Sequence, residues 1–160
     1  MSRQRSPAAA TQRGVVTIEY ALMLMLGILP LLLLTFSGVM IFAAQQSLAL
    51  AAGEGARAAL RYGDTATRRS NACLASQRSM QWLLNFSGQS ANCSTADAAP
   101  IIVSMPLACT GNPLAQCIQV EVSYNYNRHP FLPGTGRLYG WVLGTSLRSR
   151  ATVQLDLGSN

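Results

Sequence analysis

The sequence predicts an α+β protein in which a long apolar N-terminal helix precedes a small domain of helix and antiparallel sheet. Two observations indicate this class. Residues Tyr20 to Ala44 are almost all apolar, and the chain carries no formal charge between Glu19 and Glu54. The last third of the chain instead alternates apolar and polar side chains, which is the period of a half-buried strand. The 160 residues are enough for one membrane helix and one small domain.

The apolar segment, residues 20–44, predicts a transmembrane helix, because about 20 apolar residues cross a hydrocarbon core of roughly 30 Å. Arg3, Arg5 and Arg13 precede it. Positive charge before a membrane span favours a cytoplasmic N-terminus and places the rest of the chain outside the inner membrane. A secretory signal peptide cleaved at the small residues near Phe42 is the competing interpretation. Its apolar core would be about 7–15 residues, shorter than this run.

We expect the helix to begin near Val15 and to continue past the membrane. Pro30 cannot donate a hydrogen bond to the carbonyl group of Leu26, so a kink is expected there. Beyond Gln45 the chain is rich in alanine and leucine, which favour helix. The helix is expected to extend to Tyr62, because Gly63 is the kind of residue that follows a helix C-terminus.

The remainder, residues 63–160, predicts a small α+β domain. A second helix is expected over 65–87 and a loop from Gly88 to Pro100. A three-stranded antiparallel sheet should follow, with one face against the helix that leaves the membrane, since so small a sheet needs a cover. The predicted strands are Ile101 to Ala108, Ile118 to Tyr126 and Ala151 to Leu157, with a turn at Gly111–Pro113 between the first two.

The loop over residues 128–147 is irregular but unusually apolar. It is expected either to form a flap on the sheet or to face the membrane. In the second case Tyr139 and Trp141 would lie at the level of the lipid headgroups, where tyrosine and tryptophan are enriched.

The four cysteines, Cys73, Cys93, Cys109 and Cys117, all follow the apolar segment, and none is in a C-x-x-C pair. An even number of cysteines outside the cytoplasm predicts disulfides, although four buried thiols are the alternative. Four cysteines allow three connectivities, and the sequence does not decide among them. Position favours Cys109 with Cys117, which flank the predicted hairpin turn. Cys73 would then pair with Cys93.

Composition and motifs argue against several other functions. The formal net charge of +6 comes wholly from arginine, and no arginine cluster is interleaved with aromatic residues, so no nucleic-acid partner is expected. His129 is the single histidine, and the acidic residues are scattered. The sequence contains no G-x-S-x-G, P-loop or G-x-G-x-x-G motif. We therefore expect no enzymatic activity, no cofactor and no metal.

The carboxylate of Glu19 immediately precedes the apolar segment. Such a group costs about 2.5–3.5 kcal/mol at the centre of a membrane helix and less near the interface. Gly14 lies five residues before Glu19. Cleavage after Gly14 would make Val15 a new N-terminus with a positive amine. In a bundle of such helices, Glu19 of one subunit can reach the amine of a neighbour.

This order of basic leader, Gly14, four residues, Glu19 and apolar helix resembles the prepilin-peptidase signal of type IV pilins and pseudopilins. The pair Glu19-Tyr20 is more similar to the Flp-type, or tight-adherence, branch. Downstream, A-A-G-E-G-A-R-A-A over 51–59 and P-F-L-P-G-T-G-R-L over 130–138 resemble TadE-like proteins. The resemblance covers most of residues 13–157 and is thin over 64–116.

The resemblance implies a leader peptide over 1–14, a membrane helix with its extension over 15–62, and a pilin-like periplasmic domain over 63–160. Prepilin peptidase would cleave between Gly14 and Val15. The product would be a minor pseudopilin of a Flp/Tad-type pilus, anchored by one span in the bacterial inner membrane. Its partners would be other pilins and pseudopilins, the inner-membrane assembly platform and membrane lipid. The alternative is a single-pass anchor for a periplasmic binding or enzymatic domain, with Glu19 incidental.

Overall fold

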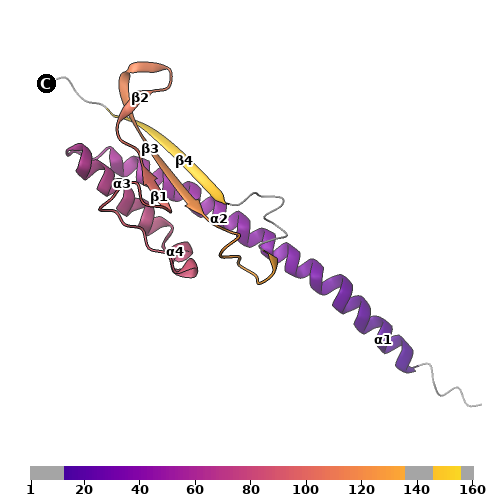
Figure 1. Ribbon diagram of the computed structural model, residues 1–160. Helices are drawn as coiled ribbons and strands as arrows, with labels where there is room; N and C mark the ends of the chain where they lie inside the picture. The colour runs from indigo at the N-terminus through magenta and orange to yellow at the C-terminus, as the bar shows by residue number, and fades with distance from the viewer. Residues whose placement is uncertain (1–12, 136–145, 156–160) are drawn as a thin grey trace, which may run out of the picture. The chain divides into compact units, whose positions relative to one another are not determined.

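The computed structural model describes residues 13–135 and 146–155. It divides into two compact units, Met1–Val39 and Met40–Asn160, and each is described by itself. The helices are α1 (Arg13–Met23), the π-helix η1 (Leu24–Ile28), α2 (Leu29–Ala59), α3 (Thr65–Ser79) and α4 (Gln81–Ser87). The strands are β1 (Ile101–Val103), β2 (Leu107–Cys109), β3 (Asn112–Tyr124) and β4 (Leu147–Leu155), as Figure 1 shows.

The first unit is helical, and its side chains from Val16 to Phe36 are exposed. The helical stretch Val16–Ala59 is long and apolar enough to cross a membrane. The π-helical turn η1 lies just before Pro30, and the Leu29 N–H donates there to the Leu24 carbonyl oxygen. The kink predicted at Pro30 stays a prediction. Proline interrupts the regular ladder because it lacks an N–H, and a π-turn is one way in which the helix adjusts.

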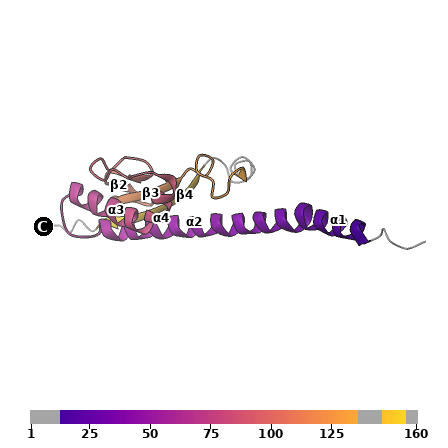
Figure 2. The same ribbon diagram turned by 90° about the horizontal axis from the view of Figure 1, so that it is seen from below.

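The second unit has two layers, with the helices on one face of the sheet (Figure 2). All pairings in the sheet are antiparallel and involve β3. Val122 pairs with Ile101 of β1 and with Ser149 of β4, so these two strands lie on opposite edges of β3. Gln116 pairs likewise with Ala108 of β2 and Leu155 of β4. β1 and β2 therefore follow one edge of β3, and β4 follows the other.

The C-terminal part of α2 supplies one side of the core. Its buried side chains recur at helical spacing and most are small, which lets neighbouring elements approach closely. They are Ile41, Ala44, Leu48, Ala51, Ala52, Ala56 and Ala59. The sheet contributes the alternate residues of β3, as the alternation in the sequence predicted: Ile118, Val120, Val122 and Tyr124. The C-terminal part of the long apolar helix is thus also a core element of this domain.

Several boundaries differ from the expectation. The helix predicted over 65–87 is two helices that meet at Met80, whose backbone (φ −108°, ψ 16°) leaves the α region. No glycine or proline marks this break. The buried residues of α4 are Leu83, Leu84 and Ser87, and Phe86 is exposed.

The strand predicted over 101–108 is divided into β1 and β2 by Ser104–Pro106. The hairpin turn consists of Thr110 and Gly111, and Gly111 adopts the positive φ of 92° that favours glycine. β4 begins four residues earlier than predicted, and Ala151, Val153 and Leu155 are less exposed than the residues between them. The predicted end at Leu157 lies outside the described residues. Helix α2 ends at Ala59 rather than at Tyr62, and Asp64 caps the next helix by accepting from the Thr67 N–H at 3.1 Å. Hydrogen bonding from the Thr67 side chain, and then from the Thr67 N–H, lowers the pKa of Asp64.

Candidate functional site

The residues predicted to govern processing and assembly lie in the first two turns of α1. The Gly14–Val15 peptide bond lies just inside the helix, and no described atom approaches within 4 Å of the position that a Cβ at Gly14 would take. Glu19 follows Gly14 by five positions, or about 7.5 Å along an α-helix. Glu19 and Tyr20 are both exposed. Glu19 is therefore free to be approached by a group from another molecule.

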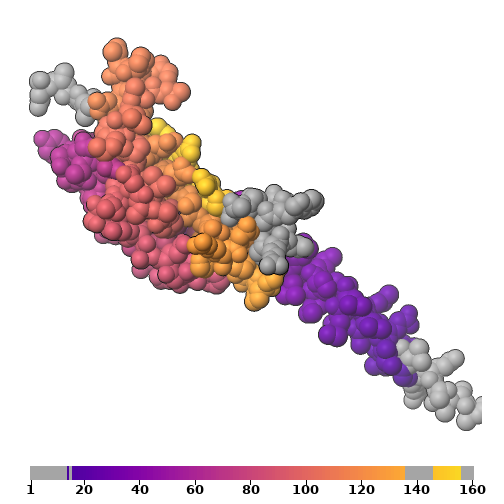
Figure 3. All heavy atoms as spheres, in the orientation of Figure 1, coloured from indigo at the N-terminus to yellow at the C-terminus, as the bar shows by residue number. Residues whose placement is uncertain are grey.

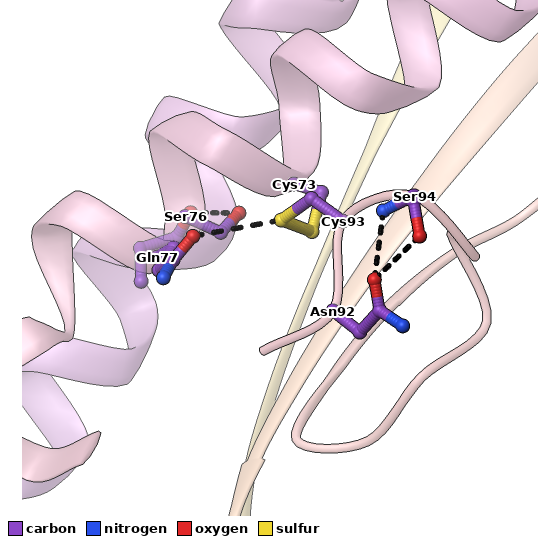
Figure 4. Close-up of a disulfide and its surroundings, with 7 residues drawn as sticks. Cys73, Ser76, Gln77, Asn92, Cys93 and Ser94 are labelled. Carbon is purple, nitrogen blue, oxygen red and sulfur yellow. Dashed lines mark hydrogen bonds between the residues drawn. A yellow bond between two sulfur atoms is a disulfide. The ribbon is translucent and has the colours of Figure 1, made fainter. Parts of the chain in front are cut away.

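Two disulfides cross-link the domain, in the pairing that sequence position favoured. Cys73–Cys93 has a Cα–Cα distance of 5.5 Å and ties α3 to the loop that follows α4 (Figure 4). Asn92 shapes this loop, since its Oδ1 accepts from the Ser94 N–H at 3.1 Å and from the Ser94 hydroxyl at 2.6 Å. The second disulfide, Cys109–Cys117, bridges β2 and β3 with a Cα–Cα distance of 5.1 Å. The hairpin that it closes protrudes from the domain (Figure 3).

Arg69 on α3 holds the loop and the sheet to the helices. Its guanidinium donates to the Val103 carbonyl oxygen at 2.9 and 3.2 Å and pairs with the Asp97 carboxylate at 2.8 Å. Its Nη1 also lies 2.9 Å from the Met105 sulfur. The side chain is only 15% exposed, whereas that of Asp97 is 74% exposed. Sequence reasoning did not single out Arg69, because its partners lie about 30 residues away in the chain.

A hollow of about 340 Å³ lies between α3 and the loop that carries Cys93. Arg69 forms part of its wall, but the bonds just described already engage the guanidinium. Over residues 13–135 and 146–155, no group of three histidine, cysteine or acidic side chains is placed to hold a metal ion. His129 belongs to the turn after β3, where its carbonyl oxygen accepts from the Tyr124 hydroxyl at 2.7 Å.

An aromatic cluster surrounds Phe131. Its ring centroid lies 5.2–6.0 Å from those of Trp82, Phe86, Tyr124 and Tyr126. Burial, followed by the nearby Tyr126, raises the pKa of the Tyr124 hydroxyl to about 12. Sequence reasoning missed the cluster, although Trp82 and Phe86 are spaced i,i+4 on one face of a helix. Tyr139 and Trp141, the other candidates of the apolar loop, lie outside the described residues.

Comparison with known proteins adds no identification. No protein-family model matches the chain, no characterised protein matches its sequence, and no solved structure matches its fold.

Proposed function

We propose that this chain is a membrane-anchored structural subunit, a TadE-like minor pseudopilin of a Flp/Tad-type pilus or a related secretion machine. The observation that carries the proposal is helix α2. It begins in a segment of exposed apolar side chains and continues unbroken to Ala59, where one face is the core of a disulfide-linked domain. A membrane anchor that is also part of the domain core suits a subunit whose domain must be held at a fixed place between a membrane and an assembly.

The first turns of α1 support cleavage by a peptidase. Gly14 has no described neighbour near its Cα, so a peptidase can approach the backbone there. After cleavage the Val15 amine would be the nearest cation to Glu19 on the membrane helix. A carboxylate removed from water must gain a partner or a proton. Pairing with the amine of a neighbouring subunit meets that need and fixes the stagger between subunits.

The charged side chains of the domain support a structural rather than a catalytic role. Glu121 pairs with Arg148 and Arg150 across β3 and β4, at 3.4 and 2.8 Å. Arg69 pairs with Asp97, and Arg57 pairs with Glu54 one turn away on α2. The pairs made by Glu121 and by Arg69 fasten elements of the domain to one another, whereas the Arg57–Glu54 pair lies within α2.

The two disulfides support an oxidising compartment, because such bonds persist outside the cytoplasm. With the arginine-rich N-terminus held in the cytoplasm, the domain would lie in the periplasm. Prepilin peptidase, other pilins and pseudopilins and the inner-membrane assembly platform are the proposed partners.

Processing is tested by N-terminal sequencing of the protein extracted from the membranes of its native cell. The proposal expects a chain that begins at Val15, and it expects Gly14→Val to leave Met1 in place. Gly27→Val is the matched control, because it changes a glycine of the same helical stretch that also lacks neighbours. A wild-type chain that begins at Met1, or near Ala43, would overturn the proposal.

Assembly is tested by cross-linking Glu19→Ala to other pilins in cells. The variant is expected to insert and to be cleaved normally, since the scissile bond is more than a turn away, but to lose the cross-links. Leu22→Ala, an exposed change on the same helix, should retain them. If Glu19→Ala cross-links as the wild type does, Glu19 is incidental, and the chain is better described as a simple membrane anchor for its domain.

A further inference from the structure

The disulfide Cys73–Cys93 joins two sulfur atoms whose surroundings differ (Figure 4). Cys73 lies on α3 within the hydrophobic core and is 1% exposed. Cys93 is half-buried in the loop that follows α4, and it lines the hollow of about 340 Å³ described above. In the other disulfide, Cys109 and Cys117 are both half-buried. Only the Cys73–Cys93 bond therefore joins an accessible cysteine to an inaccessible one.

Access helps to decide which sulfur of a disulfide a thiolate attacks. A thiolate can approach Cys93 from the hollow, whereas the core encloses Cys73. We propose that Cys93 is the residue through which this disulfide exchanges with an external thiol, and that the hollow admits the attacking sulfur. The site would accept a thiolate, whether that of a small thiol such as glutathione or that of a cysteine in an oxidoreductase.

The lining of the hollow suits an anionic nucleophile. Besides Cys93, the lining residues come from the first turns of α3 and from the loop, and they are Ala66, Thr67, Arg69, Ser70, Ser94 and Ala96. Arg69 is the one charged residue among these described residues, and its ion-pair partner Asp97 lies outside the lining. A thiolate therefore meets no like charge in the lining, and a nearby cation favours the thiolate over the thiol.

The exchange conserves atoms and electrons. The incoming thiolate forms a bond to the Cys93 sulfur as the Cys73–Cys93 bond breaks, and the electron pair of that bond passes to the Cys73 sulfur, which takes up a proton. One disulfide is replaced by one mixed disulfide. Because α3 and the core hold Cys73 in place, its thiolate can attack Cys93 again and expel the external thiol. The exchange is therefore reversible, and the fold favours the return of the original bond.

The test locates the mixed disulfide that the folded protein forms with glutathione. The detergent-solubilised full chain is incubated with reduced glutathione, the exchange is stopped with acid after a series of times, and peptide mapping by mass spectrometry identifies the modified cysteine. We expect glutathione on Cys93 in about tenfold excess over Cys73, because access controls the position of attack. The same reaction in concentrated guanidinium chloride is the control, since both cysteines are then accessible and the preference should disappear.

Glutathione found mainly on Cys73 of the folded protein, or equally on both cysteines, would overturn the proposal. A failure of this pair to react while Cys109–Cys117 reacts would overturn it as well. A second reagent is a thioredoxin-type oxidoreductase whose second active-site cysteine is replaced by serine, which traps the complex. A trapped complex through Cys93 extends the site to protein thiols, and reaction with glutathione alone assigns it to small thiols.

Two variants test the hollow itself. Ala66 is exposed and lines the hollow, so Ala66→Trp places a large side chain across the approach to Cys93. Leu74→Trp is the matched control, because Leu74 is exposed on the same helix and is not part of the lining. We expect Ala66→Trp to slow glutathione transfer to Cys93 by about fivefold and Leu74→Trp to leave the rate unchanged. Equal rates in the two variants would overturn the role of the hollow. The inference is independent of processing and assembly, so the failure of either leaves it standing.

Discussion

The Ser76 side chain occupies the space that a Cβ atom at Gly55 would need. The Ser76 hydroxyl donates to the Ala51 carbonyl oxygen at 3.0 Å, which holds α3 against α2 one turn before Gly55. A Cβ at Gly55 would also lie 3.0 Å from Val120 Cγ1 and 3.1 Å from the Ala72 carbonyl oxygen. Three elements thus meet at a residue without a side chain.

Gly55→Ala is therefore expected to lower the free energy of unfolding by about 1–3 kcal/mol, the usual range for overpacking a core. Gly53→Ala is the matched control, because nothing lies within 4 Å of its added Cβ. It should raise stability by up to about 1 kcal/mol through helix propensity. Denaturant titrations of the detergent-solubilised proteins measure both changes. Equal effects of the two variants would contradict the close packing at Gly55.

The two disulfides should contribute unequally to stability. Cys73–Cys93 closes a loop with a sequence separation of 20, and Cys109–Cys117 one with a separation of 8. The loop-entropy relation gives about 3.3 kcal/mol for the longer loop and about 2.6 kcal/mol for the shorter one. Alanine at both cysteines of a pair removes each bond in turn. Thermal unfolding should then rank Cys73/Cys93→Ala as the less stable double variant, and alkylation of the unreduced wild type should label no thiol.

Arg69 and Asp97 should respond very differently to substitution, although they form one ion pair. Arg69→Ala removes the donors that the Val103 carbonyl oxygen uses, and we expect a loss of about 1–3 kcal/mol of stability. Asp97→Asn changes a mostly exposed partner, and its effect should remain within about 0.5 kcal/mol. The same denaturant titrations check this. A large effect of Asp97→Asn would mean that the ion pair, rather than the carbonyl contact, holds the loop.

Stability should fall at high pH because of Tyr124. Burial raises the pKa of its hydroxyl to about 12, from 10.0. Between these values the unfolded chain loses the proton while the folded protein keeps it, so the folded state loses stability as the pH rises. The contribution is at most about 1.4 kcal/mol per pH unit. Tyr124→Phe should be less stable at neutral pH, because it lacks the bond to the His129 carbonyl oxygen, but its stability should decline less steeply above pH 10. Parallel slopes for the two proteins would contradict this assignment.

Patterns with a single physical cause were predicted well from the sequence. The alternation along residues 118–124 depends only on which face is buried, and the structure buries the apolar residue at every second position. The long apolar helix follows likewise from composition. The break at Met80 was not predicted, because no local breaker marks it and it depends on burying Leu83 and Leu84 in the core. Tertiary packing overrode a continuous helical pattern there.

The candidate functional site was likewise predicted only where a local sequence pattern indicates it. The roles of Gly14 and Glu19 were predicted from their spacing and stay predictions, whereas the cysteine pairing predicted from the position of the hairpin is confirmed. The contacts Trp82–Ser47 and Arg69–Val103 join segments more than 30 residues apart, so no local pattern indicates them. Such contacts depend on the crossing of α2, α3 and α4 over the sheet, which a single sequence does not specify.

The pairing of β4 with β3 has a consequence for the folding of the nascent chain. Both disulfides join residues that the ribosome has made by Cys117, whereas β4, Leu147–Leu155, is made later. A nascent chain can therefore be fully cross-linked while one edge of β3 still lacks its nine-residue neighbour. An open edge of that length invites pairing with a foreign strand. A chain truncated before Leu147 would carry correct cross-links and still be prone to aggregate, so oxidation state alone is a poor criterion of maturity for this protein.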